Sequence, residues 1–177
     1  MCNLDNILEK CKKGDRKAAE QFYRMFSAKM FALCIRYSHN RTEAEDHLQD
    51  GFIKIFDSLG QYSGKGSLEG WMRRIFINMI FEKYRKERPV QLVEDIPDIE
   101  DTEIESSVTI PEEVLLRFMT ELPEKYRLVF NLYAIEEMSH KEIATLAGIS
   151  EGTSKSNLAR ARDILKRKVN EYLQNGQ

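Results

Sequence analysis

A segment near the middle of the chain carries cations and flat rings at helical spacing. The segment is SLEGWMRRIFINMIFEKYRKER, and its outward stripe consists of Arg74, Asn78, Phe81 and Arg85. Steps of four, three and four place these residues on one side of a helix. Cations hold a nucleic-acid backbone and rings accept unpaired bases, so the stripe predicts a contact with a single strand. The alternative is a core helix with a few arginines that extend to solvent.

The rest of this segment divides into flanking residues and an apolar face. The flanking residues are Arg73, Ile77 and Tyr84. The opposite, apolar side is predicted to be the buried one, and it consists of Trp71, Met72, Ile75, Phe76, Met79 and Ile80.

A second candidate site lies in SHKEIATLAGISEGTSKSNLARAR. Ser139 and Glu142 have the spacing of a capping box. Gly148 supplies the left-handed turn residue and Ser150 can cap the next helix. Helix, tight turn and helix is the arrangement that places a second helix in the DNA major groove. Its outward groups are of types that reach base edges and phosphates: Thr153, Ser156, Asn157, Arg160 and Arg167. The alternative is an ordinary solvated face.

A third group is acidic. Asp46, Asp50 and Asp57 share one helix face, with Gln49 at its edge and Ile53 among them. Carboxylates do not bind DNA, and an exposed apolar residue between them indicates a protein partner with basic groups. A face that only keeps the chain soluble explains the same pattern.

The elements that position these groups are helices. No proline occurs before Pro89, and Asp15 can cap a helix with Ala19, Phe22, Phe26, Met30, Leu33 and Tyr37 on one face. Thr42 and Glu45 read as a capping box for the next helix, with Leu48, Phe52, Ile55, Phe56 and Leu59 inward. The loop GQYSGKG follows, and Ser67 caps the third helix.

The second half is predicted to be helical as well. Pro111 suits a first helical turn, and shorter helices are expected at about 123–134, 139–147 and 151–172. No stretch has the period of two that marks a strand. The fold class is therefore all-α: two small helical domains, 1–88 and 112–177, joined by a flexible acidic linker, 89–111.

The charge distribution agrees with this division. The formal net charge is only −2, yet residues 1–88 carry 17 Lys+Arg against 12 Asp+Glu, and residues 116–177 carry 10 against 8. Residues 89–115 carry nine acids and no base. Two basic blocks separated by an acidic strap fit nucleic-acid binding, which the total charge conceals.

Other site chemistry is not visible in the sequence. Cys2, Cys11 and Cys34 lack metal-ligand spacing and read as free thiols. No catalytic constellation, cofactor motif or metal site is expected, and no small-molecule substrate. No signal peptide or membrane-spanning run is visible, which favours a cytoplasmic protein.

Three stretches resemble the extracytoplasmic-function (ECF) sigma factors, the compact two-domain group of the sigma-70 family. DHLQDGFIKIF resembles the family's helix that grips the polymerase clamp, and GKGSLEGWMRRIFINMIFEKYRK resembles its −10 reading and melting segment. LPEKYRLVFNLYAIEEMSHKEIATLAGISEGTSKSNLARAR resembles its −35 reading domain. With the helices around them, these stretches cover nearly all of the chain except the linker.

The resemblance implies a non-enzymatic factor that binds core RNA polymerase and directs promoter-specific initiation. It implies that Asp46, Gln49 and Asp50 contact the β′ clamp helices and that Arg74 and Asn78 hold the non-template strand. The loop that captures a flipped −10 base would be Tyr62, Ser63, Gly64, Lys65, Gly66 and Ser67. The −35 readers would be Thr153, Lys155, Ser156, Asn157 and Arg160. The family also often has an anti-sigma factor as a partner.

Two positions depart from the family pattern. Ser154 stands where a β-branched apolar residue is usual, which predicts looser packing. Asn157 stands where arginine is frequent, which predicts a different −35 preference. Two other classes of protein are alternatives to a sigma factor. A two-domain helix-turn-helix repressor explains residues 120–172 equally well but not the stripe of Asn78 and Phe81. A nucleic-acid enzyme would need clustered carboxylates or a His/Cys site.

Overall fold

A computed structural model describes residues 4–87 and 110–175, and every regular element in those two ranges is helical. The chain forms two compact units, Met1–Tyr84 and Arg85–Gln177. The predicted all-α fold class is confirmed. The expected acidic linker lies outside the described residues except for its last two positions.

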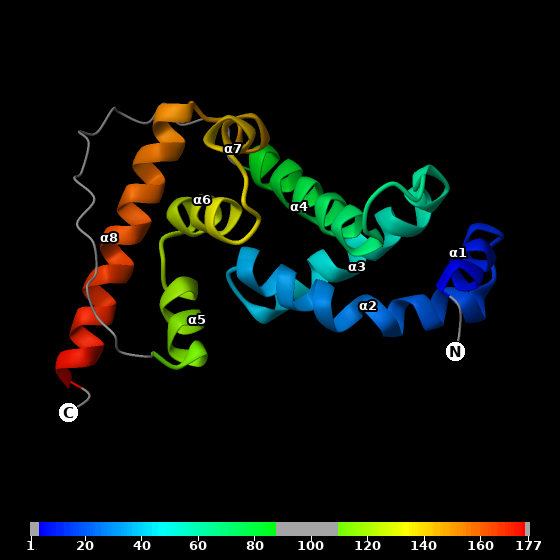
Figure 1. Cartoon of the computed structure of the whole chain (residues 1–177), viewed down its shortest axis with the longest axis horizontal. Helices are drawn as coiled ribbons and strands as arrows, with labels where there is room; N and C mark the ends of the chain where they lie inside the picture. The colour runs from blue at the N-terminus through cyan, green and yellow to red at the C-terminus, as the bar shows by residue number, and fades with distance from the viewer. Residues whose placement is uncertain (1–3, 88–109, 176–177) are drawn as a thin grey trace. The chain divides into compact units, whose positions relative to one another are not determined.

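The first unit contains four α-helices and one turn of 3₁₀-helix among its described residues (Figure 1). They are α1 (Leu4–Lys12), α2 (Arg16–Tyr37), α3 (Arg41–Ser58), η1 (Leu59–Gln61) and α4 (Leu68–Glu87). As predicted, the Asp15 side chain caps α2 by accepting hydrogen bonds from the backbone N–H groups of Lys17 and Ala18.

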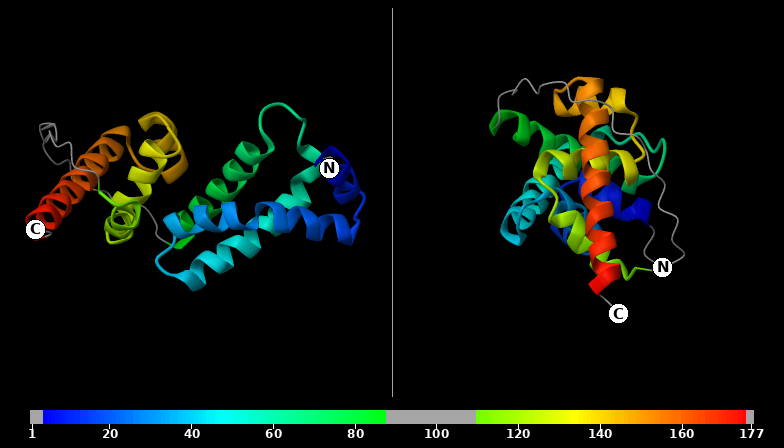
Figure 2. Two further views of the ribbon diagram at one scale, coloured as in Figure 1. Left: turned by 60° about the horizontal axis from the view of Figure 1, so that its bottom comes forward. Right: turned by 90° about the vertical axis from the view of Figure 1, so that its left-hand side faces the viewer.

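Aromatic rings form much of the core of this unit. Helices α2 and α3 run antiparallel (Figure 2), and Phe22 of α2 contacts Phe56 of α3 with ring centroids 5.8 Å apart. Helix α4 joins this core through Phe76, whose ring meets that of Phe52 edge-on with ring centroids 5.7 Å apart. Most of the predicted inward residues of α2 and α3 are buried, although Ala18 rather than Ala19 faces the core.

The start of α3 differs from the sequence prediction. Asn40, not Thr42, is the N-cap, and its side chain accepts from the backbone N–H of Glu43. The Glu43 carboxylate in turn accepts a hydrogen bond from the backbone N–H of His39, the residue before the cap. Glu45 instead pairs with Arg41 one turn away. The predicted box was wrong because Asn40 is an equally good capping residue and lies nearer the end of α2.

The second unit packs three shorter helices along one long helix (Figure 1). The short ones are α5 (Glu112–Thr120), α6 (Glu124–Ala134) and α7 (His140–Ala147), and the long one is α8 (Glu151–Asn175). Pro111 and Pro123 are the N-cap residues of α5 and α6, where a missing N–H costs nothing. None of the described helices combines the length and apolar character that crossing a membrane requires.

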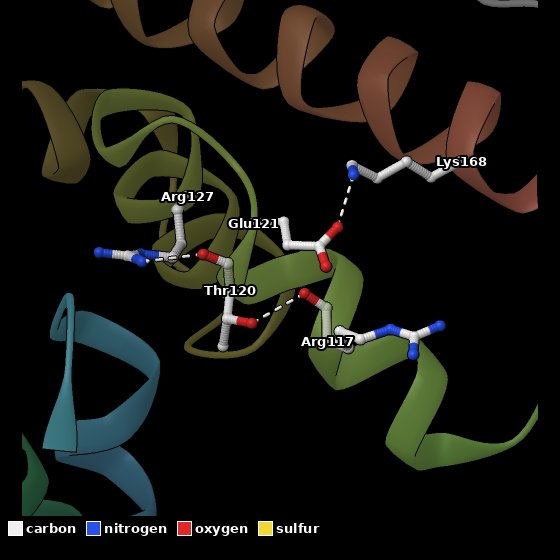
Figure 3. A network of polar contacts seen from close by, with 5 residues as sticks. All are labelled: Arg117, Thr120, Glu121, Arg127 and Lys168. Carbon is white, nitrogen blue, oxygen red and sulfur yellow. Dashed lines mark hydrogen bonds and ion pairs between the residues drawn. The ribbon is translucent and has the colours of Figure 1, made fainter.

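Polar contacts hold the turn between α5 and α6 in place (Figure 3). Lys168 of α8 donates to the Glu121 carboxylate at 2.6 Å and also lies over the ring of Phe118. The buried Arg127 guanidinium donates to the carbonyl of Thr120. The hydrogen bond from Lys168 holds the pKa of Glu121 below its usual value.

Candidate nucleic-acid and protein-binding surfaces

The outer face of α3 is acidic with an apolar centre. It consists of Asp46, Gln49, Asp50, Ile53 and Asp57, all exposed. Ile53 is 60% exposed, the largest exposure among the large apolar side chains described. None of the three carboxylates forms a salt bridge within the described part of the chain. Such a face suits a protein partner that offers cations around an apolar contact.

A buried hydrogen bond fixes the opposite side of α3. His47 is only 3% exposed, and its Nδ1 lies 3.0 Å from the Ser38 hydroxyl, which in turn donates to the carbonyl of Cys34. Burial lowers the pKa of His47, and the nearby acids of α3 oppose that shift only in part. The same burial raises the pKa of the Cys34 thiol to about 12.

The loop between η1 and α4 has a defined backbone. Gly64 and Gly66 have φ values of 76° and 81°, a region that favours glycine. The Tyr62 hydroxyl donates to the carbonyl of Gly66 at 3.0 Å. As predicted, Ser67 caps α4 by accepting from the backbone N–H of Gly70. Ser63 and Lys65 are therefore exposed at the tip of a formed loop.

The outer face of α4 is basic and polar, but it lacks the predicted ring. Arg74, Asn78 and Arg85 are exposed, and Arg73 is half-buried at their side. Phe81 is fully buried, and its ring meets that of Tyr37 in α2 edge-on. The prediction that Phe81 faces a nucleic acid was therefore wrong. Ile77 is buried as well, because α4 packs against both α2 and α3 and so buries a wider arc.

A different ring borders this face. Trp71, which the sequence pattern assigned to the core, is only half-buried, and its ring packs on Tyr62 at 5.2 Å. One turn further on lies Arg74. Exposed cations and the half-buried ring of Trp71 therefore lie on this side of α4, which is a different set from the predicted stripe of Arg74, Asn78, Phe81 and Arg85. The sequence offers one indication of this ring pair, Tyr62 in the loop before α4.

The turn between α7 and α8 has the predicted geometry. Ser139 and Glu142 form a capping box, and Gly148 adopts φ 71° and ψ 35°. The Ser150 hydroxyl accepts from the backbone N–H of Thr153 and so caps the start of α8. These three predictions are confirmed, and the unit contains a helix-turn-helix.

The predicted outward residues of α8 divide into exposed and buried ones. Lys155 and Arg167 are exposed, and Thr153, Ser156 and Arg160 are half-buried. Asn157, in contrast, is only 6% exposed, so the prediction that it faces outward was wrong. It follows the fully buried Ser154 by three residues, and this spacing places both on the packed side.

Hydrogen bonds within α8 and its cap already engage the short side chains. The Thr153 hydroxyl lies 2.9 Å from that of Ser150, and the Ser156 hydroxyl donates to the carbonyl of Thr153. The side chains of this surface that can extend furthest toward a ligand are therefore its long cations. Lys141 of α7 and Arg162 of α8 are two further exposed cations of this unit.

Metal chemistry has no visible site in the described residues. Within residues 4–87 and 110–175, no three His, Cys, Asp or Glu side chains gather as a metal ion would require. The candidate binding sites among these residues are charged surfaces of helices.

Two family models match the chain, one in each unit. The model described as "Sigma-70 region 2" matches residues 22–90, and the one described as "Sigma-70, region 4" matches residues 112–165. Together they span more than two thirds of the chain. The chain therefore belongs to the sigma-70 family of transcription initiation factors. A repressor with an unrelated N-terminal domain is excluded by the match to region 2.

Curated relatives narrow the assignment to the ECF group. The chain is 29% identical to the ECF RNA polymerase sigma factor SigW of Bacillus subtilis, over 92% of this chain and 94% of that protein. It is 28% identical to the RNA polymerase sigma-H factor of Pseudomonas aeruginosa, over 90% of each chain. These relatives place the chain among the ECF sigma factors.

Solved structures show the same fold. The sigma factor RpoE of Bartonella quintana, crystallised with the anti-sigma factor NepR, matches with a TM-score of 0.53 and 23% identity, over 85% of this chain and 96% of that one. CnrH, in complex with the cytosolic domain of CnrY, matches with a TM-score of 0.50 and 20% identity, over 96% and 99%.

Proposed function

We propose that this chain binds core RNA polymerase in the cytoplasm and directs it to promoters with a −10 and a −35 element. Residues 1–88 bind the polymerase and open the −10 element. Residues 112–177 read the −35 duplex, and residues 89–111 link the two. Polymerase catalyses RNA synthesis, and the chain selects the promoter and opens the DNA strands.

The polymerase contact is the outer face of α3. Asp46, Gln49 and Asp50 meet basic groups of the β′ clamp helices, and Ile53 enters an apolar recess between them. The support is the exposure of Ile53 and the absence of any salt bridge to the surrounding carboxylates in the described residues. Desolvating unpaired carboxylates against fixed cations costs less than breaking existing pairs first.

The −10 contact is the loop before α4 together with the outer face of α4. Cations there hold the backbone of the displaced strand, while the rings of Tyr62 and Trp71 lie where a base can stack. Capture of a flipped base offsets the few kcal/mol, roughly, that unstacking costs. The contacting residues are Tyr62, Ser63, Lys65, Ser67, Trp71, Arg73, Arg74, Asn78 and Arg85.

The −35 contact is the exposed side of α8. Lys155 and Arg160 reach base edges or phosphates in the major groove, and Arg167 holds the backbone further along. Thr153 and Ser156 lie close to the bases and add short polar contacts. Asn157 is not included because it is buried.

One observation carries the proposal: α3 and α4 belong to one packed unit and present outer faces of opposite charge. An acidic face repels DNA, and a basic face attracts it. A single rigid unit can therefore bind a protein with one helix and a DNA strand with the other. That is the requirement for a factor that carries DNA to an enzyme.

An inhibitory protein partner is part of the proposal. RpoE was solved with the anti-sigma factor NepR, and CnrH with the cytosolic domain of CnrY. We propose that an anti-sigma factor covers the α3 or DNA-binding faces of this chain and excludes polymerase.

Charge reversal separates the two faces experimentally. Asp50→Lys combined with Ile53→Asp is expected to weaken binding to core polymerase by more than about tenfold, the effect of ~1.4 kcal/mol. Glu9→Gln on α1 changes the charge by the same single unit as the double variant; it is the control and leaves binding intact. Unchanged binding in the double variant contradicts the α3 assignment.

Asn78→Ala tests the α4 face separately. This variant is expected to bind polymerase normally and to fail at opening duplex promoters. Permanganate reactivity of thymines near the start site reports the opening. Normal reactivity in the variant contradicts the α4 assignment.

A further inference from the structure

A serine occupies a buried position at the junction of the helix-turn-helix. Ser154 has no exposed surface and lies on the side of α8 that packs against the rest of the unit. A buried hydroxyl needs a hydrogen-bond partner, because desolvation otherwise goes uncompensated. Its partner is His140 of α7, whose Nδ1 lies 2.9 Å from the Ser154 Oγ.

The histidine ring is itself held from its other side. It stacks on Tyr133, which closely follows the buried Leu132 in α6, with centroids 4.8 Å apart and planes 23° apart. The guanidinium of Arg162 lies 5.7 Å from the Tyr133 centroid. Arg162 and Ser154 both belong to α8, so the chain of contacts leaves α8, crosses α7 and α6, and returns to α8 two turns later.

This connection differs in kind from apolar packing. An aliphatic side chain at position 154 would tolerate small rotations of α8, since apolar contact has no preferred direction. A hydrogen bond restricts both distance and angle. Thr153 and Lys155 are the immediate neighbours of Ser154. A rotation of α8 about its axis therefore moves both side chains across the DNA major groove that α8 is proposed to enter.

We propose that the His140–Ser154 hydrogen bond sets the rotation of α8 and that His140 is a positioning residue for −35 discrimination. The inference rests on the proposed −35 role of α8. His140 itself contacts no base. Its effect reaches the DNA through the side chains on either side of Ser154.

The experiment uses the full chain with core polymerase and a duplex library randomised at the −35 and −10 elements. Discrimination is the ratio of selection between the preferred base and the others at each position. We expect Ser154→Ala and His140→Phe each to lower −35 discrimination about fivefold, the equivalent of one net hydrogen bond. Discrimination at −10 stays unchanged.

Three variants make the test specific. The double variant His140→Phe, Ser154→Ala is expected to lose no more than either single one, because both remove the same bond. His140→Gln keeps discrimination, since its amide can still reach a hydroxyl. Thr145→Ala removes a hydroxyl that is bonded only within α7 and is the control.

Several results would overturn the inference. These are additive losses in the double variant, a Gln variant that behaves like Phe, or weaker binding to all sequences with discrimination intact. Wild-type holoenzyme that selects at −10 but not at −35 would instead remove the −35 role of α8, and this inference with it.

Discussion

Each unit contains a serine–histidine hydrogen bond at a helix junction, but the two pairs lie in opposite surroundings. His47 is buried among acids of α3, chiefly Glu43, with Lys83 as the nearby cation. His140 is half-buried between the cations Lys155 and Arg162, with Glu151 as the nearby acid. Burial is the first cause that lowers the pKa of both rings.

The two pairs also differ in which atom donates. The Ser38 hydroxyl has one hydrogen and gives it to the carbonyl of Cys34, so His47 must donate from Nδ1. No such constraint applies to Ser154, whose bond to His140 can run in either direction. The first pair is a fixed part of a core. The second lies near the cations of α8 that we propose contact DNA.

The largest expected effect comes from a change in the aromatic core of the first unit. Phe76→Ala removes a fully buried ring that packs on Phe52. We expect a loss of about 3–5 kcal/mol in the free energy of unfolding. Urea unfolding followed by the fluorescence of Trp71, the only tryptophan, measures it. Ile35→Ala on the exposed side of α2 is the control, and equal losses would contradict the assignment of the core.

A smaller effect compares the two serines directly. Ser38→Ala leaves the Nδ1–H of His47 buried without an acceptor, which costs about 1–3 kcal/mol. Ser154→Ala is expected to cost less, because water can reach the half-buried ring of His140. Urea unfolding of the two variants gives both values. A greater loss for Ser154→Ala would reverse the comparison.

Acidification should weaken the first unit through His47. The pKa of His47 in the folded chain lies below its usual value of 6.5. The stability that the neutral, buried ring contributes to the fold is therefore fully present above pH 6.5. As the pH falls, the unfolded chain takes up the proton first, and the free energy of unfolding decreases until the folded pKa is passed. Trp71 fluorescence in urea, repeated across pH, gives the slope. His47→Gln is expected to flatten it, and an identical slope in that variant would contradict the assignment.

The smallest effect concerns the surface tie between α8 and the α5–α6 turn. Lys168→Met removes the partner of an exposed carboxylate, and such pairs contribute less than about 1 kcal/mol. The pKa of Glu121 is expected to return upward toward its ordinary value, because the hydrogen bond that lowers it is lost. An NMR titration of Glu121 measures this, and an unchanged pKa would show that Lys168 is not the cause.

Local chemistry made several features predictable from the sequence. Asp15, Ser67 and the Ser139–Glu142 box begin helices because their side chains satisfy free backbone N–H groups, a property of a few adjacent residues. Gly148 follows from the same logic at a helix end. Such signals need no knowledge of the rest of the fold.

The errors arose where distant neighbours decide. A helical projection of α4 cannot show that two helices cover it, so Phe81 was assigned to solvent and Trp71 to the core. The same kind of projection puts Asn157 on the outward side of α8, yet the unit buries it together with Ser154, three residues earlier. The His140–Ser154 bond joins residues 14 positions apart, and no local pattern marks it.

The central claim is that one helix of the first unit binds polymerase while the next one holds DNA. Run-off transcription with purified core polymerase on a library of genomic fragments tests it most directly. We predict transcripts that start at defined sites sharing −10 and −35 elements, and only when the chain is added. Core polymerase that neither associates with the purified chain nor gains specific start sites would contradict the claim.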